Sequence, residues 1–236
     1  MEKRALLYEG KAKKIYQTND DELLWVSYKD DATAFNGEKK DTLAGKARLN
    51  NEISTRIFKY LQEHALESHF VKRLSDTEQL VRKVEIVPLE VVVRNVVAGS
   101  MAKRLGIEEG TPLPRPLVEF YYKDDQLGDP FISEDHIAIL QAATPDEVEV
   151  LKQQALLVNE QLVKFFTAIR VRLIDFKLEF GRTKEGTLLL ADEISPDTCR
   201  LWDIETNERL DKDLFRRNLG SLQDGYQEIL ARIEKL

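Results

Sequence analysis

The amino-acid sequence predicts an α+β fold of two lobes, in which helices pack on antiparallel sheets. Three observations favour this fold. The first 30 residues alternate short apolar runs with polar turns, a pattern typical of an antiparallel meander. Segments further along the chain place apolar residues at helical spacing on one face. Pro88 interrupts a valine-rich stretch from Leu80 to Val97, and we expect this bend to divide the chain into lobes of residues 1–86 and 87–236.

The N-terminal lobe is predicted to contain three strands and one long helix. The strands fall at 5–8, 15–16 and 23–28, where the apolar runs lie. From Thr42 to about Ala65, apolar residues recur at helical spacing, which predicts an amphipathic helix packed on the meander. The apolar face of this helix carries Leu49, Ile53, Ile57, Tyr60 and Leu61.

Two strands within 80–97 are predicted to meet at Pro88, where the two lobes join, because proline cannot donate a hydrogen bond to a strand ladder. Gly99 opens a short helix that runs to about Leu105. The segment 111–116 holds three of the seven prolines, so we expect an extended loop there, followed by a strand over 117–122.

The remainder of the C-terminal lobe is predicted as a long helix, a hairpin and a final helix. Thr144-Pro145-Asp146-Glu147 combines a capping residue, a proline at the first helical position and a glutamate three residues after the cap, which predicts a helix running to about Ala168. The segments 171–180 and 187–194 are typical of a β-hairpin. The last helix carries Leu219, Leu222, Tyr226, Ile229 and Ile233 on one face.

The composition limits the partners that the protein can bind. The chain has 236 residues, 42% of them hydrophobic and 33% charged, so it can bury a sizeable core. The formal net charge of −7 disfavours nucleic acid and anionic membranes as partners. Cys199 is the only cysteine, which excludes an internal disulfide framework and a cysteine-rich zinc site. No apolar run has the length of a membrane span or a signal peptide, and a reducing cytoplasm is the expected compartment.

Two acidic residues on neighbouring predicted strands form a candidate metal site. In the strand around Lys177, side chains alternate between faces, so Asp175, Lys177 and Glu179 share one face. A two-residue turn at Glu185-Gly186 would set Asp192 directly opposite Glu179. Two carboxylates at that distance repel each other unless a cation bridges them, and hard oxygen ligands suit Mg²⁺. The alternative is a solvated strand face on which Lys177 neutralises its neighbours.

A glycine-containing turn between the first two strands is the candidate phosphate site. In Gly10-Lys11-Ala12-Lys13, the glycine permits close backbone approach and the lysines supply positive charge for phosphate oxygens. The segment lacks the Gly-Lys-Ser/Thr ending of a Walker motif, but a glycine-containing hairpin over nucleotide phosphates is the arrangement that protein kinases use. The alternative is an exposed basic turn.

Two further segments are candidate anion sites. Arg94 follows an apolar stretch and Ser100 lies at a predicted helix start, where free backbone N–H groups favour anions. Arg200 comes shortly after the predicted carboxylate strands and can reach the same site. Simpler interpretations exist, because Ser100 suits a helix cap and both arginines suit an exposed surface. The three histidines fall in no chemical motif, so any general base is expected to be a carboxylate or a lysine.

Two stretches of the chain resemble signatures of the SAICAR synthetase family of purine biosynthesis. They are Ile86-Val87-Pro88-Leu89-Glu90-Val91-Val92-Val93-Arg94 continuing to Ala98-Gly99-Ser100, and Ile174-Asp175-Phe176-Lys177-Leu178-Glu179-Phe180-Gly181. The similarity also includes 9–13, 74–77, 103–106, 192–197 and 200–203, so it covers nearly the whole chain. Ala34-Phe35-Asn36 departs from the pattern, because we expect many members to carry an aspartate in this loop.

The resemblance implies an ATP-dependent ligase that joins L-aspartate to the carboxylate of carboxyaminoimidazole ribonucleotide (CAIR), with release of ADP and phosphate. It also implies a fold related to ATP-grasp and kinase-like nucleotide-binding folds, and a homo-oligomer, with a dimer as the expected form. A small-molecule kinase and a non-catalytic nucleotide-sensing module are the competing functions.

The resemblance also implies roles for the candidate residues. The N-terminal lobe would cover the ATP phosphates with Gly10, Lys11, Ala12 and Lys13. The adenine would lie near Ile86 and the nucleotide near Lys123, while Glu179 and Asp192 would hold Mg²⁺.

The remaining candidates would bind the other substrates and assist the reaction. The ribonucleotide or L-aspartate would be bound by Arg94, Ser100 and Arg200. Lys177 would stabilise charge on the transferring phosphoryl group. Asp175 would orient Lys177 or take a proton from the amine.

Overall fold

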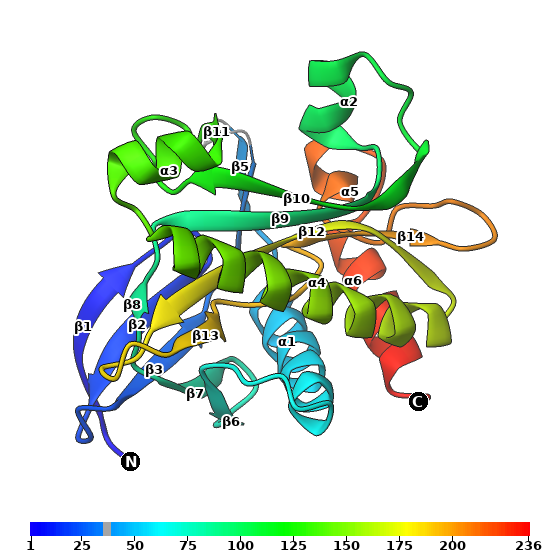
Figure 1. Ribbon diagram of the computed structural model, residues 1–236. Coiled ribbons are helices and arrows are strands. Elements are labelled where there is room, and N and C mark those ends of the chain that lie inside the picture. The colour runs from blue at the N-terminus through cyan, green and yellow to red at the C-terminus, as the bar shows by residue number, and fades with distance from the viewer. Residues whose placement is uncertain (35–38) are drawn as a thin grey trace.

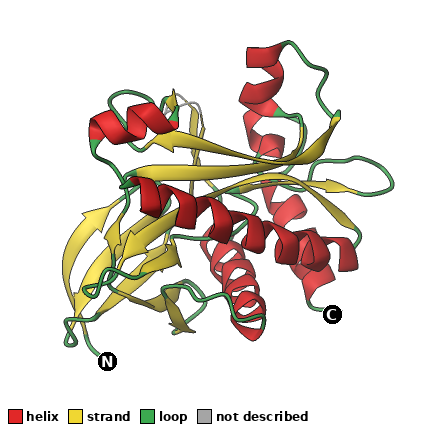
Figure 2. Cartoon of the chain, viewed as in Figure 1, coloured by secondary structure: helices red, strands yellow, loops and turns green. Residues whose placement is uncertain are grey.

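A computed structural model describes residues 1–34 and 39–236, and Figure 1 shows their arrangement. The strands form a five-stranded sheet, a seven-stranded sheet and a two-stranded sheet, with the helices packed on and between them (Figure 2). The strand pairs within all three sheets are antiparallel. The predicted α+β class is therefore confirmed. Asn36, the departure noted in the sequence, lies outside the described residues.

The five-stranded sheet has the strand order β1-β2-β3-β7-β6. Its strands are β1 (Lys3–Glu9), β2 (Lys13–Thr18), β3 (Leu23–Tyr28), β6 (Phe70–Arg73) and β7 (Glu78–Arg82). The first three form the antiparallel meander that the alternating apolar runs predict. The small sheet pairs β4 (Asp31–Ala34) with β5 (Lys39–Thr42).

The seven-stranded sheet has the order β11-β10-β9-β12-β13, with β8 and β14 also paired to β12. Its strands are β8 (Glu85–Ile86), β9 (Leu89–Val96), β10 (Pro112–Tyr122), β11 (Phe131–Ile132), β12 (Val171–Arg182), β13 (Leu188–Ala191) and β14 (Cys199–Asp203). Pro88 separates β8 from β9, which confirms the predicted bend. The segment 111–116, expected as a loop, lies almost wholly in β10. The pairing with β9 is irregular between Pro112 and Leu117, so the prolines are accommodated without donating to a regular ladder.

The helices are α1 (Lys46–Glu63), α2 (Gly99–Leu105), α3 (Glu134–Leu140), α4 (Pro145–Ala168), α5 (Asp213–Arg216) and α6 (Leu222–Ile233). The start of α4 is as predicted, because the Thr144 side chain accepts from the backbone N–H of Glu147 while the Glu147 carboxylate accepts from the backbone N–H of Thr144. α1 begins later than the predicted Thr42, since Thr42 ends β5 and Gly45, with φ 87°, precedes the helix. Within 1–34 and 39–236, no helix is both long enough and apolar enough to cross a membrane.

The largest apolar cluster joins α1, α4 and α6 to the seven-stranded sheet, and a smaller one packs β3 and β7 of the five-stranded sheet against the start of α1. α4 lies across β9 and β12 (Figure 1), and α1 packs mainly against α6. Ile53 and Ile57 of α1 are fully buried in the same apolar cluster as Phe176 and Phe180 of β12. The lobe boundary at residue 86 stays a prediction. β8 lies on the N-terminal side of this predicted boundary, yet it pairs with β12 of the seven-stranded sheet.

The hairpin of β12 and β13 differs from the predicted register by one residue. Thr183 pairs with Thr187 around a three-residue turn that ends at Gly186, where φ is 84°. A glycine with positive φ in the last position of such a turn is favourable, which explains why the two-residue turn was wrong. Ala191, not Asp192, therefore lies opposite Glu179. Leu219, expected on the final helix, precedes α6 and is exposed.

Candidate active site

The predicted site residues gather around one cavity of about 1550 Å³. Its lining includes the turn between β1 and β2, strand β9, the outward face of β12, and the segment that follows β13. The predicted residues that line it are Gly10, Lys11, Ala12, Lys13, Ile86, Arg94, Lys123, Asp175, Lys177, Glu179, Asp192 and Arg200. Ser100 is absent from this lining but lies 3.3 Å from Arg94 Nη2. The structure thus brings together candidates from distant parts of the sequence.

Strand alternation positions the acidic residues of β12 as expected. Phe176, Leu178 and Phe180 point into the apolar core, while the intervening side chains line the cavity. Asp192 joins them by a route that the sequence did not predict. It follows the last residue of β13 with a φ of 60°, so the chain leaves the strand at this position and the carboxylate reaches the cavity despite the shifted register.

Lysines surround the carboxylate pair of Glu179 and Asp192. Lys123 Nζ lies 2.9 Å from Glu179 Oε1, and Lys177 Nζ lies 3.6 Å from the same oxygen. Lys13 forms an ion pair with Asp192 and lies 3.1 Å from Glu193 Oε1. Three lysine ammonium groups therefore surround two carboxylates, one on β12 and one directly after β13.

Burial and charge shift the pKa values of these groups in opposite directions. Burial and the charge of Asp192 raise the pKa of Glu179, and they outweigh Lys177 and Lys123, which act to lower it. Burial also acts to raise the pKa of Asp192, but Lys13 and Lys177 outweigh it and lower that pKa to about 2. The pKa of Lys177 is raised, because Glu179 and Glu90 outweigh the effect of its burial. The lysines are therefore charged at neutral pH and Asp192 is ionised.

The two lysines of the glycine turn have different environments. The Lys13 side chain is 13% exposed and paired inside the cavity, whereas the Lys11 side chain is 51% exposed and pairs with Asp125 at the surface, at 2.7 Å. The turn is closed by a hydrogen bond of 2.8 Å from the Gly10 N–H to the Lys13 carbonyl. The alternative interpretation, an exposed basic turn, therefore fits Lys11 but not Lys13.

Glu90 is the partner of Lys177 that the sequence did not indicate. Lys177 Nζ donates to Glu90 Oε1 at 2.6 Å, across the pairing of β12 with β9. Among the described residues, the ion-pair partners of Lys177 are Glu90 and Glu179. Asp175 instead accepts from Arg94 Nη1 at 2.5 Å and from Arg200 Nη1 at 2.9 Å. The predicted contact by which Asp175 would orient Lys177 is therefore not made.

The arginine site is built on a buried glutamate. Arg94 is 3% exposed, and its Nε donates to Glu119 Oε2 at 2.7 Å. Arg104 also pairs with Glu119, and Tyr121 Oη donates to the same carboxylate at 3.1 Å. Arg94 is therefore too buried for the surface interpretation, and the Arg200 side chain is only 19% exposed. A lone acidic residue in the apolar strand 117–122 is the sequence signal that could have identified Glu119.

Gly99 brings Arg200 close to the start of α2. Its φ is 55°, and a Cβ built at Gly99 would lie only 2.5 Å from Arg200 Nη2. A side chain there would push the guanidinium away, so glycine permits this approach. Arg200 also donates to Asp213 at 3.0 Å, which fixes the guanidinium between two carboxylates.

His69 and Cys199 also line the cavity, and neither has the pKa of a group that is ionised at neutral pH. Burial lowers the pKa of His69 to about 3, so this histidine is neutral at physiological pH. Burial raises the pKa of the Cys199 thiol, as expected for a packed residue rather than a nucleophile.

Solved structures share this fold over almost the whole chain. The crystal structure of phosphoribosylaminoimidazole-succinocarboxamide synthase from Ehrlichia chaffeensis matches with a TM-score of 0.95 at 46% identity, covering 98% of this chain and 99% of that chain. A SAICAR synthetase in complex with ADP also matches with a TM-score of 0.95, at 48% identity and 98% coverage of both chains. The fold and the cavity together define an ATP-grasp-like enzyme.

Sequence comparison gives the family. The family model described as SAICAR synthetase matches residues 6–233. Phosphoribosylaminoimidazole-succinocarboxamide synthase of Halalkalibacterium halodurans is 71% identical over 235 residues, which is 100% of this chain and 99% of the relative. The synthase of the same name from Bacillus subtilis is 68% identical over 231 residues, or 98% of this chain and 96% of the relative. The chain belongs to the SAICAR synthetase family and is a ligase.

Proposed function

We propose that this protein joins L-aspartate to the carboxylate of CAIR and converts ATP to ADP and phosphate, as a step of purine biosynthesis. The family match over residues 6–233 carries this proposal. The cavity supports it, because its lining offers a site for a metal-bound nucleotide next to a site for further anions. A relative solved with ADP supports ATP as the nucleotide.

We assign the nucleotide to the cavity wall formed by the glycine turn. Gly10 permits close backbone approach, and the backbone N–H groups of Lys11 and Ala12 and the Lys13 ammonium can bind phosphate oxygens. Lys11 is exposed at the cavity mouth and supplies a second cation. Ile86 lines the cavity as an apolar residue suited to an adenine ring, and Lys123 lies beside Glu179.

The carboxylate pair fits Mg²⁺. Glu179 Oε2 and Asp192 Oδ2 accept no hydrogen bond from the described residues, so each carboxylate retains an oxygen for a cation. The part of the chain that the structure describes contains no cluster of three or more metal-ligating side chains. Two carboxylates are sufficient for Mg²⁺, which commonly takes one or two from the protein and completes its shell with waters and phosphates. Bound there, Mg²⁺ would neutralise charge on the ATP phosphates.

The residues of the cavity suit a two-step ligation. A carboxylate resists attack by an amine until one of its oxygens becomes part of a good leaving group. Transfer of the γ-phosphoryl group of ATP to a CAIR carboxylate oxygen would form an acyl phosphate and ADP. The L-aspartate amine would then attack the acyl carbon, forming the amide bond and releasing phosphate and the amine proton. Lys177 and Lys13, both charged and partly buried, would stabilise the negative charge that the phosphoryl group carries during transfer.

Arg94, Ser100 and Arg200 are proposed to bind the anionic groups of the ribonucleotide or of L-aspartate. Both arginines donate to Asp175, which therefore suits a role in holding the two guanidinium groups. Removal of the amine proton is then left to another group or to water. Ser100 contributes through its contact with Arg94.

The test is ADP release by purified protein supplied with Mg²⁺-ATP, CAIR and L-aspartate, with each component omitted in turn. Release that needs every component, together with a succinocarboxamide product, is the expected result. A stable phosphorylated product formed without L-aspartate would instead indicate a small-molecule kinase. Absence of ADP release under every mixture would indicate a non-catalytic nucleotide-sensing module.

We also expect a homodimer in the cytoplasm. Exposed apolar side chains on α4 offer a surface for a second copy, and they are Val150, Leu156, Leu157 and Val163. Light scattering after gel filtration tests the dimer, and a monomer at micromolar concentration would contradict it.

A further inference from the structure

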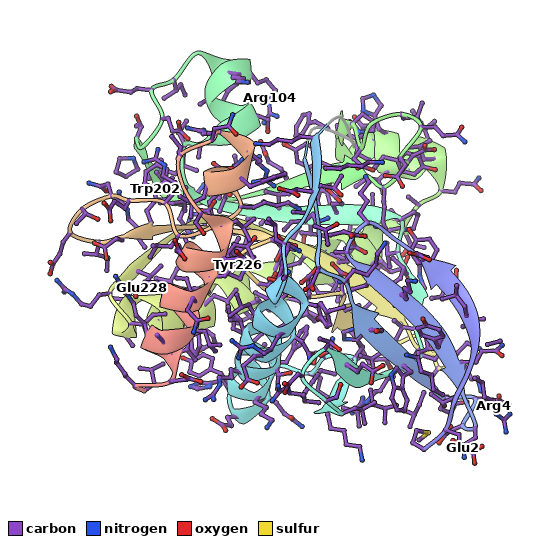
Figure 3. All side chains as sticks on the ribbon, turned by 180° about the vertical axis from the view of Figure 1, so that it is seen from behind. Glu2, Arg4, Arg104, Trp202, Tyr226 and Glu228 are labelled. Atoms are coloured by element: carbon purple, nitrogen blue, oxygen red, sulfur yellow. The ribbon has the colours of Figure 1, made fainter. Side chains whose placement is uncertain are left out.

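The buried carboxylate of Asp197, in the cavity lining, accepts hydrogen bonds from three side chains on two helices. Lys46 Nζ, which is fully buried at the start of α1, lies 2.5 Å from Asp197 Oδ2. Asn50 Nδ2, one turn further along α1, donates to the same oxygen at 2.9 Å. Tyr226 Oη of α6 donates to Asp197 Oδ1 at 2.5 Å. Figure 3 shows Tyr226 in the middle of the molecule, where α6 passes α1.

Lys212 is a neighbouring cation that lacks a close partner. Its side chain lines the cavity and is 16% exposed, and its Nζ lies 3.8 Å from Asp197 Oδ1. That separation is longer than a hydrogen bond. Within 1–34 and 39–236, the Lys212 ammonium donates no hydrogen bond to another group. A buried ammonium without a close partner is costly unless a ligand supplies one.

The donors to Asp197 share its negative charge and so reduce its attraction for Lys212. Tyr226 already donates to Oδ1, the oxygen nearer to Lys212, and α1 supplies two donors to Oδ2. We propose that Tyr226 and Lys46 are positioning residues: by donating to both oxygens of Asp197 they weaken its attraction for the Lys212 ammonium, which stays out of a close ion pair and available to bind a substrate carboxylate in the cavity.

The electrostatics of Lys212 are consistent with this role. Burial lowers its pKa, and the charges of Lys46 and Arg216 lower it further, against the raising effect of Asp197 and Glu193. A carboxylate bound at Lys212 would relieve this cost by supplying the missing negative charge. Neither Tyr226 nor Lys46 lines the cavity, so both act on a ligand only through Asp197 and Lys212.

The inference rests on the proposed function, which brings two sources of carboxylate into the cavity. One is L-aspartate, with two carboxylates, and the other is the carboxylate of CAIR. Lys212 lines the cavity together with Glu193, which follows Asp192 of the metal pair, and with Arg216, which pairs with Asp213 of the Arg200 site. Separate KM values for the two substrates distinguish which carboxylate it binds.

Steady-state kinetics of Lys212→Met and Tyr226→Phe test the proposal, with Tyr60→Phe as the matched control. Tyr60 of α1 packs against Phe165 of α4 and does not line the cavity. Loss of a charge-assisted hydrogen bond should raise the KM for one carboxylate substrate about tenfold or more in Lys212→Met. Tyr226→Phe should raise the same KM about threefold, because Lys212 is drawn to Asp197, with little change in the KM for ATP. Tyr60→Phe should keep the wild-type values.

A titration that does not need turnover completes the test. NMR of the lysine side chains labelled at the ε-carbon should show Lys212 titrating below the ordinary lysine range, and at higher pH in Tyr226→Phe than in the wild type. Unchanged KM values for both carboxylate substrates in Lys212→Met would overturn the substrate role. A lower melting temperature in Tyr226→Phe with unchanged KM values and an unchanged Lys212 titration would show that Tyr226 is only structural. Failure of the wild type to need L-aspartate for ADP release would overturn the proposed function, whereas the titration would still decide the positioning role.

Discussion

Lys13 on β2 forms an ion pair with Asp192, which follows β13 and lies 179 positions further along the chain. The Lys13 side chain is 13% exposed and that of Asp192 23%, so the pair is largely shielded from water. The contact connects the five-stranded sheet to the seven-stranded sheet at the cavity. The candidate phosphate turn and the candidate metal pair are therefore coupled before any ligand binds.

This coupling predicts different effects for two identical substitutions. Lys13→Met removes a shielded cation and leaves Asp192 and Glu193 without it, so the free energy of unfolding should fall by about 2 kcal/mol. Lys11→Met removes an exposed pair and should change stability by less than about 0.5 kcal/mol. Both should raise the KM for ATP. Urea denaturation and steady-state kinetics measure the two effects, and equal stability of the two variants would contradict the structural role of Lys13.

The carboxylate pair is predicted to be essential for turnover. Glu179→Gln and Asp192→Asn keep the side-chain shape but remove the charge that would hold Mg²⁺, so kcat should fall about a hundredfold or more while the fold remains intact. Removal of divalent cations with EDTA should abolish activity, and added Mg²⁺ should restore it. Glu160→Gln, an exposed acidic position on α4, is the matched control. A fully active variant that carries both Glu179→Gln and Asp192→Asn would contradict the metal-pair proposal.

Glu119 is predicted to act on substrate affinity through the arginines. Glu119→Gln retains a hydrogen-bond acceptor but loses the charge that pairs with Arg94 and Arg104. The guanidinium of Arg94 would then be less well fixed, and the KM for CAIR should rise about tenfold. Glu108→Gln, at an exposed position before β10, should have no effect. An unchanged KM for CAIR, together with a folded variant, would show that Arg94 does not need this carboxylate.

Local patterns in the sequence predicted much of this site. The period-two alternation of β12 separates Lys177, which lines the cavity, from its core-facing neighbours Phe176 and Leu178, because successive side chains of a strand point to opposite faces. The cap at Thr144 determines the start of α4 in the same local way. The hairpin register was harder to predict, since one additional turn residue shifts every pair.

Local sequence patterns did not predict the contacts between distant segments. Glu90 faces Lys177 only because β9 pairs with β12, 87 positions away. Asp197 and Lys46 meet at a separation of 151 positions, through the packing of α1 beside the segment after β13. Periodicity gives the face of a residue but not the element opposite it, so these partners required the three-dimensional structure.

Glu147, at the start of α4, is predicted to stabilise the protein only while its carboxyl is ionised. Glu147 forms an ion pair with Arg182 of β12 at 2.5 Å, and the two side chains are 22% and 23% exposed. The Arg182 hydrogen bonds, which outweigh the opposing effect of burial, lower the pKa of Glu147 to about 2. A carboxyl whose pKa is lower in the folded state stabilises the protein above its unfolded pKa of about 4.3, and this contribution is lost as the pH falls toward 2.

Glu147→Gln isolates this contribution, because glutamine can keep the reciprocal cap with Thr144 while the charge is lost. At pH 7 the variant should be less stable than the wild type by about 1 kcal/mol, after allowance for partial exposure. The difference should shrink between pH 4.3 and 2, roughly the interval over which the wild-type carboxyl becomes protonated. Glu149→Gln, whose side chain is 58% exposed on the same helix, should show little difference at any pH. Urea denaturation of the three proteins across this range measures the effect, and a difference that stays constant down to pH 2 would show that the charge of Glu147 does not stabilise the fold.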